Sequence, residues 1–151
     1  MTPPPLHWQV LEFNQLSNEM LYAILKIRQE VFAIEQNSVY LDVDGKDLGA
    51  LHVLAHLDDA IFAYSRVLAP GVKYTEASIG RVLTAPQSRG SGAGKLLMQR
   101  SIECCEQHYP SSGIRISAQL YLQHFYESFG FSATSEPYDE DGIAHIEMLK
   151  P

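Results

Sequence analysis

A glycine-rich segment beyond the middle of the chain has the residue types of an anion-binding loop. It runs in the order Arg89, Gly90, Ser91, Gly92, Ala93, Gly94 and Lys95. An apolar run that predicts a strand precedes it, and a periodic apolar pattern that predicts a helix follows it. The first N–H groups of a helix have no partner within the helix, and glycine lets the backbone curl so that several N–H groups converge on one anion. The segment therefore predicts a cradle for a phosphate or pyrophosphate group.

Two common phosphate-binding patterns do not fit this segment. A P-loop requires Gly-x-x-x-x-Gly-Lys-Ser/Thr, whereas Arg89 stands at the first glycine position and Leu96 follows the lysine. A dinucleotide-binding fingerprint requires Gly-x-Gly-x-x-Gly, and its third glycine falls on Lys95 or Leu97, depending on where the count starts. A tight strand-to-helix turn without a ligand is the alternative interpretation of the segment taken alone.

A second segment, residues 117–131, places a polar residue and aromatic residues between a strand and a helix. Gln119 follows the predicted strand, and Tyr126 lies within the short predicted helix. Together with the Arg-x-x-Gly-x-Gly pattern of residues 89–94, this segment resembles the two signatures of the GNAT superfamily of N-acetyltransferases. The usual Asn of the family falls on Gln119 and its usual small residue on Leu122, so contacts from these two side chains do not follow from the resemblance.

The remainder of the chain resembles the ElaA-type branch of that superfamily. The matching stretches are residues 28–36, 44–47, 52–55, 136–138 and 141–146. The resemblance thus extends from about Trp8 to Met148.

The resemblance implies an enzyme that transfers an acetyl group from acetyl-CoA to an amine by direct attack in a ternary complex, without a metal. In the family, the strand before the loop offers N–H groups to the thioester oxyanion, the loop grips the pyrophosphate, and the Tyr126 hydroxyl would approach the CoA sulfur. The implied cofactor-binding residues are Val82, Leu83, Thr84, Arg89, Gly90, Ser91, Gly92, Ala93, Gly94, Lys95, Gln119 and Phe125.

Attack by the amine requires the removal of a proton. An amine with a pKa of about 10.4 is neutral to only about one part in a few thousand at pH 7, so a carboxylate or an imidazole has to accept that proton. Four residues are candidates for this base: Glu35, Asp44, His52 and His145. Glu35 ends the first predicted helix, near where the superfamily admits acceptors, and is favoured. An exposed carboxylate at a helix end is the alternative.

Other chemically suggestive residues have structural alternatives. His52 and His56 lie in a strand-like run without a zinc-protease motif, so a metal site is not expected. Phe125, Phe129 and Phe131 fit a core better than a cofactor contact, and residues 139–141 fit a solvated turn better than an acceptor site. Four basic residues stand where CoA phosphates would lie, although the first could pair with a nearby carboxylate instead: Arg81, Arg89, Lys95 and Arg100.

The elements that must position these residues alternate along the chain. Strands are expected at residues 8–13, 50–57, 61–69, 77–84, 114–118 and 143–149, and helices at 17–35, 92–109 and 122–129. Residues 36–49 are expected to form a loop. An early hairpin among interleaved strands and helices predicts an α/β fold (α+β in some schemes) with a mixed sheet and helices on both faces. The GNAT fold that the resemblance implies is mostly antiparallel.

The composition restricts the class of protein. The 151 residues fit a single domain, residues 1–151, and a net charge of −7 argues against a nucleic-acid partner. The neighbouring Cys104 and Cys105 are unsuited to a structural disulfide and indicate reduced thiols. No signal peptide and no membrane span are expected, so the predicted location is the cytoplasm.

Two other functions and several acceptors stay open at this stage. An acyl-homoserine-lactone synthase shares a GNAT-like fold, and Arg28, Val31, Phe32 and the acidic residues 42 and 44 faintly resemble its N-terminal signature. A non-catalytic CoA-binding module is the other alternative. The acceptor could be a polyamine, an amino acid, a peptide N-terminus or a protein lysine. The oligomeric state also stays open, with a homodimer among the alternatives.

Overall fold

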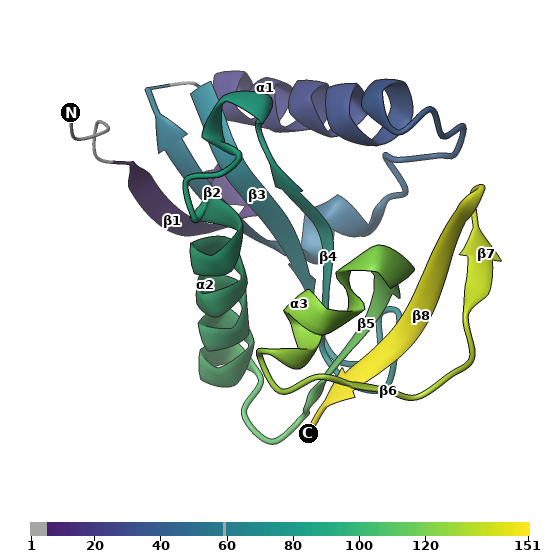
Figure 1. Ribbon diagram of the computed structural model, residues 1–151. Helices are drawn as coiled ribbons and strands as arrows, with labels where there is room; N and C mark the ends of the chain where they lie inside the picture. Colours follow the sequence, from purple (N-terminus) through teal and green to yellow (C-terminus); the bar gives the residue numbers. More distant parts are fainter. Residues whose placement is uncertain (1–5, 59) are drawn as a thin grey trace.

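The first sheet is antiparallel and supplies one wall of the site described below. The computed structural model describes residues 6–58 and 60–151, and Figure 1 shows its sheets and helices. The strand order is β1 (His7–Glu12), β2 (Leu51–Leu57), β3 (Ala60–Leu68) and β4 (Ser78–Thr84). These strands agree with the predicted ones to within one residue at each end.

The second sheet supplies the opposite wall. β8 (Ile143–Lys150) lies between β5 (Ile114–Gln119) and two short strands, β6 (Ser132–Ala133) and β7 (Tyr138–Glu140). The two sheets meet where β4 and β5 begin, through a parallel bridge between Ala77 and Ile114. Because β4 and β5 are paired only at this end within the described residues, they diverge toward their carboxyl ends.

The first helix changes type along its length. α1 (Asn18–Arg28) begins at Ser17, whose hydroxyl accepts a hydrogen bond from the Met20 N–H at 3.0 Å. It continues as a π-helix, η2 (Gln29–Glu35). The sequence therefore predicts the extent of this helix correctly, but not its wider second half, a form that often occurs at functional sites.

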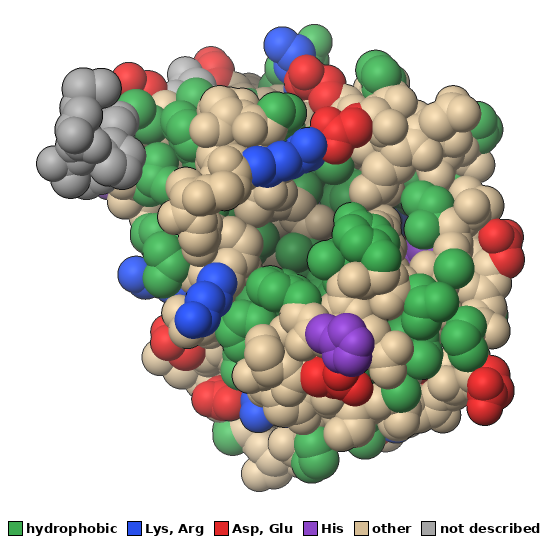
Figure 2. Space-filling view, in the orientation of Figure 1, with side chains coloured by type: hydrophobic (Ala, Val, Ile, Leu, Met, Phe, Trp, Pro, Cys, Tyr) green, Lys and Arg blue, Asp and Glu red, His purple; other side chains and the backbone are tan. Residues whose placement is uncertain are grey.

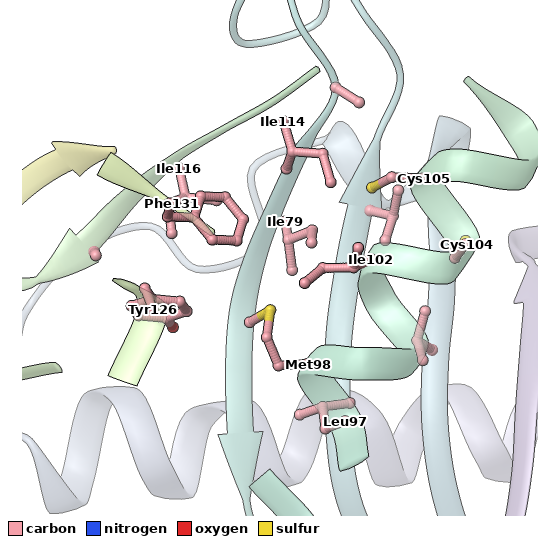
Figure 3. Packing of buried hydrophobic residues seen from close by; sticks show 14 of the residues in the cluster. Ile79, Leu97, Met98, Ile102, Cys104, Cys105, Ile114, Ile116, Tyr126 and Phe131 are labelled. Carbon is pink, nitrogen blue, oxygen red and sulfur yellow. The ribbon is translucent and has the colours of Figure 1, made fainter. Parts of the chain in front are cut away.

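Helices cover both faces of the first sheet. Side chains alternate along a strand, so Val53 of β2 packs in the cluster that contains α2 (Ala93–His108), while Leu54 packs in the cluster that contains α1. Figure 3 shows Leu97, Met98 and Ile102 of α2 directed toward Ile79 of β4. The predicted α/β architecture is confirmed.

Three short elements complete the fold. α3 (Gln123–Glu127) follows a 3₁₀ turn, η5 (Leu120–Leu122), and is shorter than the predicted helix at 122–129. Residues 36–49 contain a second 3₁₀ turn, η3 (Lys46–Gly49). In the described part of the chain, none of the helices combines the length and the apolar character needed to cross a membrane.

Candidate active site

A pocket of about 350 Å³ lies where β4 and β5 diverge. Its lining includes Ile79, Gly80, Arg81, Val82, Ile116, Ser117, Gln119, Tyr126, Glu140 and His145. Ile116 belongs to the face of β5 that packs in the α2 and α3 cluster, whereas Ser117 and Gln119 alternate onto the other face. Residues from both faces of β5 therefore line the same pocket.

The glycine-rich loop lies directly at the N-terminus of α2. Gly90 and Gly92 have φ values of +82° and +86°, a conformation that L side chains rarely adopt, and a Cβ added at either would meet no protein atom within 4 Å. The Ser88 hydroxyl donates to the Phe62 carbonyl at 2.8 Å, which ties the loop to β3. The backbone thus curls at the start of α2, whose first N–H groups have no partner within the helix, as a phosphate cradle requires.

Arg89 and Glu35 form an ion pair at the edge of this loop. The distance from Arg89 Nη2 to Glu35 Oε1 is 2.7 Å, and both side chains are 43% exposed. Arg89 Nη2 also donates to the Thr84 carbonyl at 3.3 Å. The pair joins the end of η2 to the end of β4, and Glu35 does not line the pocket between β4 and β5.

Basic side chains lie near the glycine-rich loop. Figure 2 shows a hollow near the centre of this face, with Lys and Arg side chains on its rim. Lys95 is exposed at the start of α2, whereas the Arg100 guanidinium lies 5.4 Å from the centre of the Trp8 ring. Arg81 pairs with two carboxylates of the loop at 36–49, as described below, whereas Arg89 pairs with Glu35.

The backbone of β4 is irregular beside the pocket. Tyr64 of β3 pairs with Leu83, and Arg66 pairs with Gly80, so Arg81 and Val82 together stand opposite a single residue of β3. Arg81 has a φ of +50°. Such a bulge takes backbone groups out of the sheet ladder, here next to the space where β4 and β5 separate.

Arg81 is held in this conformation by acidic residues of the loop at 36–49. Its Nε donates to Asp42 Oδ1 at 2.7 Å, and its Nη2 donates to Asp44 Oδ2 at 3.3 Å. Two further arginines bind the same loop: the buried Arg28 donates to Asp42 at 3.0 Å, and Arg66 donates to Asp44 at 2.8 Å. The pairing of Arg81 with a carboxylate, left open as an alternative above, is confirmed.

Asp47 completes this network and connects it to His52. Arg28 Nη1 donates to Asp47 Oδ1 at 2.7 Å. His52 is fully buried, with Nδ1 2.6 Å from the Tyr64 hydroxyl and Nε2 3.0 Å from the Asp47 carbonyl. Burial lowers the pKa of His52. Neither Asp44 nor His52 lines the pocket, so both serve the network and are unsuited to be the base.

Tyr126 presents a buried ring to the same pocket. Its side chain packs edge-on against Phe125 and Phe131, with ring centroids 5.2 and 6.0 Å away. Burial raises the pKa of Tyr126 to about 12. The phenol therefore keeps its proton near neutral pH and can donate a hydrogen bond.

Gln119 and Phe125, the two other predicted cofactor residues from the second segment, have different surroundings. Gln119 lines the pocket, and its Nε2 donates to Gln36 Oε1 at 3.2 Å. Phe125 is half-buried and packs edge-on against Phe129 at 5.2 Å. Packing within the aromatic cluster accounts for Phe125 without a ligand.

The β7–β8 hairpin brings a carboxylate and an imidazole to the pocket wall. His145 Nδ1 lies 2.8 Å from the Ile143 carbonyl, and its Nε2 lies 3.3 Å from Glu140 Oε2. Glu140 belongs to β7, so the interpretation of residues 139–141 as a solvated turn is wrong for the first two of them. The turn itself is Asp141-Gly142, with φ values of +54° and +85°. Asp-Gly between two strand-like runs is a hairpin signal that could have predicted this arrangement.

The fold and the site together define a class of protein. Diverging strands β4 and β5 border a pocket, β4 is bulged beside it, and a glycine loop lies at the start of α2. A family model described as an acetyltransferase (GNAT) domain matches residues 30–151. The chain belongs to the GNAT acetyltransferase family, and the resemblance found in its sequence is confirmed.

Individual relatives support this assignment. The protein ElaA of Escherichia coli is 41% identical over 147 residues, which are 96% of each chain, and its crystal structure matches with a TM-score of 0.91. The crystal structure of an acyl-CoA N-acyltransferase from Pseudomonas aeruginosa matches with a TM-score of 0.93 at 38% identity, over 97% of this chain and all of that one. A CoA-dependent acyl-homoserine lactone synthase matches with a TM-score of 0.78 at 12% identity, over 96% of this chain and 82% of that one, a similarity of fold alone.

Proposed function

We propose that this chain, as one GNAT domain over residues 1–151, transfers the acetyl group of acetyl-CoA to an amine by direct attack in a ternary complex. The observation that supports the proposal most directly is the glycine loop. Its left-handed glycines lie at the N-terminus of α2, and a Cβ added at Gly94 would lie 3.7 Å from Thr84 Cγ2 at the end of β4, so the loop adjoins the strand that borders the pocket. We place the pyrophosphate on residues 89–95 and the pantetheine along residues 82–84.

In this proposal the thioester lies between the β4 bulge and Tyr126. Backbone N–H groups near Val82 stabilise the oxyanion that forms on attack. Tyr126 donates a hydrogen bond to the departing thiolate, and its raised pKa favours this over complete proton transfer. Gln119 borders the acyl group. Glu35, favoured as the base from sequence, is held by Arg89 at the cofactor loop, so its proposed role becomes the positioning of that loop.

Two alternative functions lose their specific support. The residues that suggested an acyl-homoserine-lactone synthase include Arg28, Asp42 and Asp44, and all three belong to the ion network that holds the β4 bulge. A non-catalytic CoA-binding module has no need for Tyr126 at the pocket where an acceptor would meet the thioester. The proposed location is the cytoplasm, where acetyl-CoA is available.

A screen with acetyl-CoA and a panel of acceptors tests the proposal. The panel contains alkylamines, polyamines, amino acids, peptides with a free N-terminus and peptides with an internal lysine. Release of free thiol, with the acetylated product identified by mass spectrometry, is expected for at least one class. Binding of CoA without transfer to any amine would contradict the proposed function and favour the CoA-binding module.

A further inference from the structure

The pocket that Tyr126 lines is also lined by a histidine whose two ring nitrogens have different partners. His145 is 8% exposed. A carbonyl oxygen can only accept, so Nδ1 must donate its proton to Ile143 at 2.8 Å. Nε2 is then the nitrogen that gains or loses a proton, and it faces Glu140 Oε2 at 3.3 Å. The arrangement fixes the tautomer and places a carboxylate beside the nitrogen that exchanges its proton.

Glu140 is itself held in place without losing its access to solvent. Its Oε1 lies 3.3 Å from the Ser117 hydroxyl of β5, and its side chain is 42% exposed. Tyr138, which bonds to the same Ser117 hydroxyl, stacks on His145 with the rings 6.2 Å apart. An aromatic surface next to a carboxylate attracts an organic ammonium ion.

The position of His145 within the sheet connects it to the thioester region. Its Cα pairs with that of Gln119, the last residue of β5. It lies on the face of β8 opposite the buried Ile146, and so away from α2 and α3. A molecule that reaches His145 therefore approaches from the side opposite the helix that carries the glycine loop.

We propose that the acceptor is a primary alkylammonium ion that binds against Glu140, and that His145 Nε2 takes its proton. This inference rests on the proposed function and adds the base and the charge state of the acceptor. The ammonium gives one proton to His145, and the neutral nitrogen attacks the thioester carbon. The new C–N bond forms as the C–S bond breaks, the second proton passes from nitrogen to the departing thiolate, and His145 returns its proton to solvent. Glu140 acts as a positioning residue.

Other charged and titratable groups border the same space and affect its pH dependence. They are Tyr40, Lys73, Arg81, Tyr121, Tyr126, Tyr138 and Asp141. Arg81 is paired with two carboxylates, and burial raises the pKa values of Tyr40, Tyr126 and Tyr138. The comparison below therefore varies the charge of the acceptor as well as the pH.

The test compares two nearly isosteric acceptors with acetyl-CoA: n-butylamine, which is an ammonium at pH 7, and O-propylhydroxylamine, which is neutral. The substitution His145→Gln should lower kcat/KM for n-butylamine by about 10²-fold or more at pH 7 and for O-propylhydroxylamine by less than fivefold. The n-butylamine deficit should shrink toward pH 10, where the amine loses its own proton. Glu140→Gln, at a more exposed position, should weaken n-butylamine selectively through KM.

A matched control and the contradicting outcomes follow from the structure. His108→Gln removes an exposed imidazole at the far end of α2 and should leave both rates unchanged. Equal losses for both acceptors in His145→Gln and Glu140→Gln would overturn the inference and leave the proposed function intact. A wild-type protein that acetylates other amines but not n-butylamine would do the same. Failure with every amine would overturn the proposed function as well.

Discussion

At the scale of single residues, the environment of Tyr126 decides which kind of catalysis it can perform. Its pKa is raised by burial to about 12, whereas a cysteine-like thiol ionises at about 8.5. Complete transfer of the phenol proton to the thiolate is therefore uphill by about 5 kcal/mol. A hydrogen bond that strengthens as charge develops on sulfur avoids this cost.

The substitution Tyr126→Phe tests that distinction. It keeps the ring and its packing against Phe125 and Phe131. A hydrogen bond to a charged group contributes about 1.5–3 kcal/mol, so kcat at saturating acetyl-CoA should fall by about 10–100-fold while CoA affinity is unchanged. Tyr22→Phe, at an exposed position on α1, is the control. A loss below fivefold, with chemistry shown to be rate-limiting, would make Tyr126 a packing residue.

The residues of the site differ in how far the sequence could predict them. The glycine loop and the segment around Tyr126 are contiguous stretches, so their residue types and spacing suffice to match them to the family signatures. The contact between His145 and Glu140 depends on a tight turn. Whether His145 can act as a base there depends on which ring nitrogen faces the carboxylate. Asp44 and His52 had suitable chemistry for a base, but only the folded chain reveals that both are committed to arginines or to a buried network.

At the scale of elements, the loop before α2 depends on backbone conformation more than on side-chain contacts. Gly92 and Gly71 are a matched pair: their φ values are +86° and +89°, and a Cβ added at either meets nothing within 4 Å. A valine at either position costs similar backbone strain, on the order of 1–2 kcal/mol. Only at Gly92 does the added side chain project beside the first N–H groups of a long helix.

We expect Gly92→Val to lower CoA affinity by at least tenfold, about 1.4 kcal/mol, because the side chain blocks the approach of the phosphate. Gly71→Val should lower the melting temperature about as much as Gly92→Val does, because the backbone strain is similar, but it should leave CoA affinity unchanged. Calorimetry with CoA on both folded variants makes the comparison. Equal CoA affinities would contradict the placement of the pyrophosphate on this loop.

The bulge in β4 was not predictable from its residues, because an arginine with positive φ has no local signal. Its cause is tertiary: Asp42 and Asp44 bind the Arg81 side chain. The π-helix at Gln29–Glu35 is similar, since its residues continue an ordinary helical pattern. By contrast, the strands, α1 and α2 follow from periodicity and turn residues that act locally.

Comparison of Arg81→Ala with Arg81→Gly tests whether the ion pairs maintain the bulge. Both variants lose the pairs with Asp42 and Asp44, but glycine adopts a φ of +50° without strain. We expect kcat/KM for acetyl-CoA to fall at least tenfold further in the alanine variant than in the glycine variant, as the alanine relaxes toward regular strand geometry. Equal losses in both variants would indicate that the side chain acts directly and not through the backbone.

At the scale of the whole molecule, three arginines and three aspartates tie α1, the loop at 36–49, β3 and β4 together beside the site. Burial alone would raise the pKa values of Asp44 and Asp47, but the hydrogen bonds and charges of the arginines outweigh it and hold both pKa values below their usual range. These carboxylates thus bind protons less readily in the folded chain than in the unfolded chain. His52 behaves in the same sense, because burial lowers its pKa.

The sign of the pH dependence follows from these three shifts. The unfolded chain binds more protons, so the free energy of unfolding falls as pH falls. The contribution of His52 to the free energy of unfolding is lost as the pH falls below about 6.5, and that of the two aspartates as the pH falls below about 4. In each case the loss continues until the pH reaches the pKa of the group in the folded chain. Asp47→Asn removes the carboxylate that Arg28 and Arg66 share, while each arginine keeps one other aspartate partner, and we expect it to cost about 1.5–3 kcal/mol at pH 7, the contribution of a hydrogen bond to a charged group. Because the wild-type carboxylates are themselves protonated in acid, the two unfolding curves should converge toward pH 2.

Urea unfolding from pH 2 to 8 measures this, with Glu106→Gln on the exposed face of α2 as the control. A deficit for Asp47→Asn that is the same at every pH would show that the network contributes shape alone and that its charges do not stabilise the fold around the site.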